Sequence, residues 1–113
     1  MNRRGEAAEA LACDYLRRQG LVVTARNYRC RFGEIDVVAR EGGTLVFVEV
    51  RRRRSEAFGG AAASITAAKR SRLIAAARHY LARLDEAPPC RFDALLIRGE
   101  PARVEWIRDA FGE

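Results

Sequence analysis

The sequence predicts an α/β protein, a mixed β-sheet flanked by helices in the element order αβββαββ. Two segments repeat apolar residues at helical spacing, and the runs between and after them are rich in strand-forming residues. Two of those runs flank Glu41-Gly42-Gly43, the strongest hairpin signal in the chain. With 113 residues, 49% of them apolar, the chain can bury a core without cross-links, so we expect one domain over residues 1–113.

The first helix is predicted over residues 3–19, where apolar residues recur every three or four positions until Gly20 ends the pattern. A Gly/Ala loop at residues 57–63 precedes the second helix, predicted over residues 65–84 with Ser64 as its N-cap. Five strands complete the prediction. Their predicted ranges are residues 21–28, 34–40, 44–51, 92–98 and 103–107.

The net charge of +6 is unevenly distributed along the chain. Between Val50 and Leu84 lie nine basic residues and one acid, whereas the rest of the chain is slightly acidic. Such a field suits a polyanion, so we expect nucleic acid as the partner, with DNA favoured over RNA. The alternative is a basic face that water solvates. The residues expected to contact nucleic acid are Arg51, Arg52, Arg53, Arg54, Lys69, Arg70 and Arg72.

Several classes of protein are excluded. Cys13, Cys30 and Cys90 are far apart and odd in number, so neither a disulfide framework nor a zinc site is indicated, and a cytoplasmic protein is expected. Mixed apolar and charged residues at the start exclude a secretory leader, and no apolar run is long enough to span a membrane. The single histidine, His79, argues against histidine-ligated metals and His-dependent triads.

The predicted hairpin places acidic side chains opposite one another. If its turn is centred on the two glycines, opposing residue numbers sum to 85, so Asp36 faces Glu49 and Glu34 faces Arg51. Two carboxylates at about 5 Å repel by roughly 3 kcal/mol at an effective dielectric near 20. A divalent cation between them removes that repulsion, and oxygen ligands favour Mg²⁺ or Mn²⁺. The alternative is a solvated sheet end, but Glu49 lies inside an apolar run, where an unpaired acid is costly.

Several separated motifs resemble one known family. They are Gly5-Glu6, Gly33-Glu34-Ile35-Asp36, Phe47-Val48-Glu49-Val50-Arg51, Gly59-Gly60-Ala61-Ala62-Ala63-Ser64 and Val104-Glu105-Trp106-Ile107. Together they resemble the YraN-like family, small bacterial proteins of uncharacterised role in the restriction-endonuclease-like nuclease superfamily, which includes Holliday-junction resolvases. The resemblance covers nearly the whole chain. It implies an αβββαβ core, followed here by one further strand, and an Asp…Glu-x-Lys site.

The resemblance also implies roles for individual residues. Asp36 and Glu49 fall on the two metal-binding acids, Arg51 on the lysine position, and Glu6 on the acid that related resolvases present from the first helix. Arg51 departs from the pattern, because a guanidinium stays protonated and cannot act as a general base, although it can clamp a phosphate. Glu6 lies nearly opposite the apolar stripe of its helix and Glu9 at the edge of that stripe, so helical phase favours Glu9.

Lys69 is the only lysine of the chain, and it lies on the predicted buried face of the second helix. A partly desolvated lysine there can orient or deprotonate an attacking water, which Arg51 cannot do. The alternative is a side chain that reaches back to solvent from the end of an apolar stripe.

The sequence therefore predicts a Mg²⁺- or Mn²⁺-dependent endonuclease that hydrolyses phosphodiester bonds of structured or branched DNA in repair or recombination. Asp36, Glu49 and the Val50 carbonyl are the expected metal ligands, and Asp36, Glu49, Arg51, Lys69 and Glu6 the expected catalytic residues. The main alternative is a nucleic-acid-binding module that keeps the fold but lacks the chemistry. An interaction protein without a nucleic-acid role is disfavoured, because it leaves the basic segment and the paired acids unexplained. The oligomeric state stays open, with a homodimer as one option.

Overall fold

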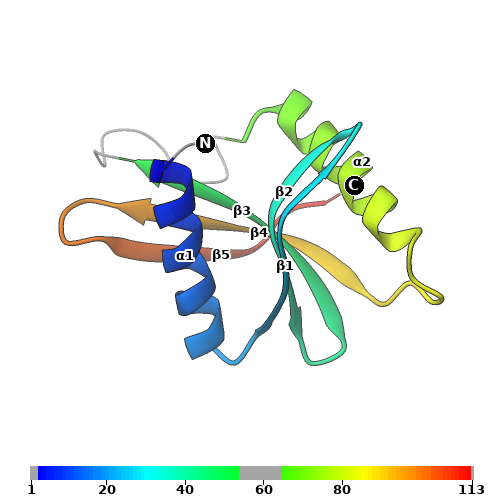
Figure 1. Cartoon of the computed structure of the whole chain (residues 1–113), viewed down its shortest axis with the longest axis horizontal. Coiled ribbons are helices and arrows are strands. Elements are labelled where there is room, and N and C mark those ends of the chain that lie inside the picture. The colour runs from blue at the N-terminus through cyan, green and yellow to red at the C-terminus, as the bar shows by residue number, and fades with distance from the viewer. Residues whose placement is uncertain (1–2, 54–64, 113) are drawn as a thin grey trace.

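A five-stranded mixed sheet with a helix on each face makes up the part of the chain that the structure describes (Figure 1). This computed structural model describes residues 3–53 and 65–112. The elements are α1 (Arg3–Arg18), β1 (Val22–Cys30), β2 (Gly33–Glu41), β3 (Thr44–Arg53), α2 (Ala67–Leu81), β4 (Cys90–Arg98) and β5 (Arg103–Phe111). The predicted α/β class and the element order are confirmed.

The strands lie in the sheet in their order along the chain. Neighbouring strands are antiparallel except for β3 and β4, which are parallel because the chain crosses over through α2 between them. The register predicted for the β2–β3 hairpin is confirmed, with Val37 opposite Val48 and Glu41 opposite Thr44. This register brings the acids of the two strands to the same end of the sheet.

The two faces of the sheet carry separate apolar clusters, as alternating strand side chains require. Val46, Val48 and Leu95 pack with Leu16 on the α1 face. Phe47 and Leu96 pack with α2 on the other. Since Glu49 shares its alternation with Phe47, its side chain is directed to the face that α2 covers.

The start of α2 differs from the prediction. Thr66, not Ser64, caps the helix, because its hydroxyl accepts a hydrogen bond from the backbone N–H of Lys69 at 3.2 Å. The helix ends at Leu81 rather than Leu84, since the next residues close tighter turns through i→i−3 hydrogen bonds. Ser64 and the predicted loop at residues 57–63 lie outside the described residues.

The last strand is longer than predicted and reaches Phe111. Asp109 interrupts it in the left-handed conformation, with φ 52°, and its backbone N–H donates to the buried Asp93 carboxylate. Neither described helix is long and apolar enough to cross a lipid bilayer.

Candidate metal centre

The site forms where β2 and β3 separate. Their pairing ends at Val37 opposite Val48, although β2 continues along β1 to Gly33 and β3 continues along β4 to Arg53. Figure 1 shows the β1–β2 hairpin turning away from β3 toward α2. The first residues beyond the last β2–β3 pair are Asp36 and Glu49, so both carboxylates lie at the apex of the gap between the strands.

The β1–β2 hairpin bends at this same point. Asn27, whose place in the register is opposite Asp36, has a left-handed backbone with φ 52°. Residues two positions apart in a regular strand share one face of the sheet. Ile35, however, packs on the α2 face and Val37 on the α1 face. The alternation of β2 therefore breaks at Asp36, and the bend carries Asp36 and Glu34 out of the regular sheet.

Asp36 takes over a hydrogen bond that the sheet no longer makes. Its Oδ2 accepts from the backbone N–H of Val50 at 2.9 Å, in place of a β2 carbonyl. The N–H and C=O of one strand residue point to the same side. The Val50 carbonyl therefore also faces β2 beyond the last pair, where the ladder offers it no partner.

Asp36 and Glu49 form a close acid pair. Glu49 is only 4% exposed. Burial, followed by a hydrogen bond to the Glu49 carboxyl and the charge of that group, raises the pKa of Asp36 to about 9. Asp36 therefore keeps its proton at neutral pH, beside the Glu49 carboxyl. A cation bound here would take the place of that proton.

Lys69 places a positive charge beside this pair of acids. Its Nζ lies 2.9 Å from Glu49 Oε2, and its side chain is about one-third exposed. The contact is an ion pair. Glu49 Oε2 has no hydrogen-bond partner among the described residues. The Thr66 cap fixes Lys69 in the first turn of α2, so the start of the helix places the ammonium beside the acids.

Glu9 reaches the same site from α1. It is 8% exposed, and its Oε1 is buried with no hydrogen-bond partner among the described residues. One carboxylate oxygen each of Glu9, Glu34 and Asp36 lie within 4.8 Å of one another. Oxygens on adjacent positions of one Mg²⁺ are about 2.9 Å apart, so the three side chains would have to move closer for one ion to bind them all. An all-oxygen donor set with an orphaned buried carboxylate fits Mg²⁺ or Mn²⁺.

Comparison with known proteins identifies the family. The sequence model of the Uncharacterised protein family UPF0102 matches residues 8–97. The chain belongs to that family. A UPF0102 protein of Methylobacillus flagellatus is 62% identical over 98% of both chains. A UPF0102 protein of Nitrosomonas europaea is 60% identical over 97% of this chain and 94% of its own. The YraN-like resemblance is confirmed, since YraN-like is another name for UPF0102.

The structure brings some of the expected site residues together in this UPF0102 protein and separates others. Asp36, Glu49 and Lys69 are in contact, with Val50 beside them. Glu6 is exposed, and Glu9, one helical turn later, is the α1 acid that lies with Asp36. In the sequence, only the position of Glu9 at the edge of the apolar stripe of its helix favours Glu9 over Glu6.

The expected pairing of Glu34 with Arg51 is wrong, because β2 and β3 have separated before these residues meet. Glu34 lies instead with Asp36 and Glu9 and pairs with Arg29 at 3.5 Å. Arg51 is half-buried at the end of β3. The sequence held no signal for Glu34, since the bend in β2 depends on the path of β1 and α2.

The expected nucleic-acid-binding residues differ in their surroundings. Arg72 is exposed on α2, and the exposed Arg52 pairs with Glu100 at 3.5 Å. Arg70 is held in the fold, because its Nε donates to the Ile65 carbonyl at 3.1 Å. The Arg53 side chain and Arg54 lie outside the described residues.

Proposed function

We propose that this UPF0102 protein is a metal-dependent endonuclease that hydrolyses phosphodiester bonds of structured or branched DNA. One observation carries the proposal: Asp36 and Glu49 are the first residues beyond the last β2–β3 pair, with the Lys69 ammonium 2.9 Å from Glu49. Two acids and a lysine next to a backbone carbonyl beyond the β2–β3 ladder are the groups that metal-dependent phosphodiester hydrolysis requires. The implied restriction-endonuclease-like fold agrees with this chemistry.

Asp36, Glu49 and the Val50 carbonyl would hold Mg²⁺ or Mn²⁺, and the orphaned Glu9 oxygen offers a further ligand. When bound, the ion would lower the pKa of a coordinated water and offset charge on the scissile phosphate. The buried walls of the site keep these carboxylates poorly solvated, which strengthens their interaction with any cation.

Lys69 and Arg51 together would fill the roles that a single lysine has in the resembled site. Lys69 Nζ is already within contact of Glu49, so it can hold a water by hydrogen bond and exchange a proton with it. Arg51 keeps its proton at all relevant pH values. Its guanidinium can therefore bind the phosphate and stabilise charge that develops there, but cannot accept a proton.

The surface around the site suits a phosphate backbone. α2 carries Lys69, Arg70, Arg72 and Arg78 and no acidic residue over Ala67–Leu81. Its first turn lies at the site, so a backbone bound along α2 would pass the acids. Phosphate contacts of this kind give affinity that is independent of sequence and falls steeply with salt.

A nucleic-acid-binding module without catalysis is the second candidate. Arg51 in place of the lysine favours it, because the resembled site then lacks its usual proton acceptor. The two candidates share the basic surface and differ only in whether DNA is cut.

Cleavage assays separate the candidates. Branched and linear DNA are incubated with Mg²⁺ or Mn²⁺ and wild type, Asp36→Asn, or the matched control Asp85→Asn at an exposed position beyond α2. The proposal expects cleavage by wild type and the control, and none by Asp36→Asn. Binding without cleavage by wild type and by Arg51→Lys would leave only the binding module. Absence of both would overturn the two candidates.

A further inference from the structure

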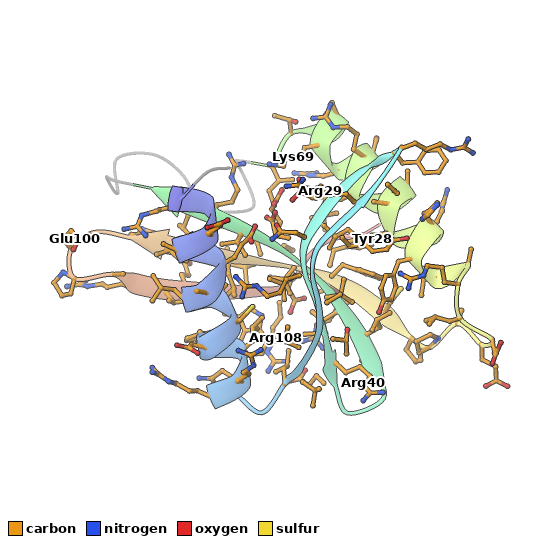
Figure 2. All side chains as sticks on the ribbon, in the orientation of Figure 1. Tyr28, Arg29, Arg40, Lys69, Glu100 and Arg108 are labelled. Carbon is orange, nitrogen blue, oxygen red and sulfur yellow. The ribbon has the colours of Figure 1, made fainter. Side chains whose placement is uncertain are left out.

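The turn between β1 and β2 exposes an aromatic side chain. Phe32 is 41% exposed, and the guanidinium of Arg31 lies 4.9 Å from the centre of its ring. Arg29, on the same hairpin, is also exposed, and Figure 2 shows it there, with Lys69 near the start of α2. Residues 26–33 carry three arginines and no acid.

The hairpin is held rigidly against α2. A Cβ on Gly33 would lie 3.3 Å from the Arg72 carbonyl oxygen, so a larger residue there would have to move the hairpin or α2 by a few tenths of an ångström. The Tyr28 hydroxyl is hydrogen-bonded to His79 Nδ1, and the Phe32 ring lies 6.0 Å from the His79 ring. These contacts hold the hairpin against α2, while Phe32 remains 41% exposed.

Aromatic rings and cations alternate over this surface. Arg83 lies 5.4 Å from the rings of both Tyr28 and Tyr80, on the same helix end. Bases stack on aromatic rings and arginine guanidinium groups, while the arginines also attract phosphates. The patch therefore combines the two chemistries that single-stranded nucleic acid offers, and its positive charge disfavours a basic or neutral protein surface.

The distance from Phe32 to the acids suits neighbouring nucleotides. Phe32 lies in the turn before β2 and precedes Asp36 by four residues, which span at most about 13 Å at a strand rise of about 3.3 Å per residue. One strand of duplex DNA rises about 3.4 Å per base, so this span corresponds to about four bases.

We propose that the β1–β2 hairpin recognises unpaired bases, with Phe32 stacking on a base about four nucleotides from the metal centre and Arg29 and Arg31 holding the flanking phosphates. This inference rests on the proposed nucleic-acid function and adds its substrate class. It makes the hairpin the element that distinguishes DNA with unpaired bases from plain duplex.

The test measures binding in EDTA, so that cleavage plays no part. Two probes share one sequence: a continuous duplex, and a duplex with a short unpaired stretch containing 2-aminopurine, whose fluorescence falls when it stacks. Wild type should prefer the unpaired probe and quench it. Phe32→Ala should lose about 5- to 150-fold in affinity for that probe alone and should not quench it. Phe32→Trp should keep both properties.

Controls separate the outcomes. Leu84→Ala removes an apolar side chain of similar exposure, 38%, beyond the end of α2 and should leave both affinities unchanged. Equal binding of both probes by wild type and Phe32→Ala, with weaker binding of both by Arg72→Glu, would overturn the role of the hairpin and keep nucleic-acid binding. Loss of self-association in Phe32→Ala with unchanged DNA binding would assign Phe32 to an interface between copies. No binding of either probe by wild type would overturn the proposed function as well.

Discussion

Two groups of acids differ in how the fold satisfies them. In the first group, Asp93 on β4 and Glu41 at the end of β2 share the Arg91 guanidinium. Asp93 on β4 is fully buried and accepts hydrogen bonds from Arg91 Nε, Trp106 Nε1 and the Asp109 N–H, each at 2.9 Å. Asp36, Glu49 and Glu9 have between them one backbone N–H and one ammonium, and Glu9 Oε1 has no hydrogen-bond partner among the described residues.

The difference shows which acids the fold needs. The donors around Asp93 repay the cost of burying its charge and tie β4 to β5. The acids between β2 and β3 repel one another, which a fold selected for stability alone would avoid. Such a cluster of under-satisfied acids is expected where a cation or substrate is to bind.

Removing each acid should affect stability very differently. Asp93→Ala leaves Arg91 and the indole N–H without their acceptor and should lower the free energy of unfolding by about 3–5 kcal/mol. Asp36→Asn replaces a carboxyl that is already protonated at pH 7 by an amide of the same shape, so it should change the free energy of unfolding by less than about 1 kcal/mol. Urea denaturation at pH 7 without metal measures both, and equal losses would remove the distinction between the two groups.

Divalent cations should stabilise the protein through one group only. Mn²⁺ at 100 times its dissociation constant should add about 2.7 kcal/mol and raise Tm by on the order of 10 °C. Glu49→Gln should abolish this rise. Glu41→Gln is the matched control, because Glu41 pairs with Arg91 at 2.9 Å in the satisfied group. A rise that persists in Glu49→Gln would place the ion elsewhere.

The two groups should also respond to pH in opposite directions. The folded pKa of Asp36, about 9, lies above its unfolded value, so its stabilising contribution is complete below about pH 4 and is lost as pH rises toward 9. Arg108 and Arg91 lower the pKa of Glu41 to about 2, so its contribution is present above about pH 4.5 and is lost as pH falls toward 2. The Tm of Asp36→Asn and that of Glu41→Gln, each compared with the Tm of wild type across this pH range, measure the two contributions. A pH-independent difference for Asp36→Asn would contradict the raised pKa of Asp36.

Lys69 is expected to matter more for cleavage than for stability. Lys69→Met leaves the buried Glu49 carboxylate without its cation and should lower the free energy of unfolding by about 1–3 kcal/mol. Cleavage should nevertheless be lost, while Arg51→Lys should cut DNA at least as well as wild type. Single-turnover cleavage beside urea denaturation tests this, and unchanged cleavage by Lys69→Met would show that Lys69 only reaches back to solvent.

The hairpin register could be predicted because it depends on local signals, the two glycines and the alternation of the strands. It placed Asp36 beside Glu49 correctly. The position of Glu34 could not be predicted, since β2 leaves β3 at the point where the neighbouring strand β1 bends at Asn27. Asp93 lies at the start of the strand predicted over residues 92–98, but its burial depends on donors from β5, a contact between distant parts of the chain.

Calorimetric titration of Mn²⁺ into the metal-free protein tests the metal centre most directly. At pH 7 in two buffers of different ionisation enthalpy, we expect one ion per chain and release of about one proton, which Asp36 holds in the metal-free protein. Binding should vanish in both Asp36→Asn and Glu49→Gln. Absence of binding by wild type, or undiminished binding by both variants, would contradict a metal centre at the gap between β2 and β3.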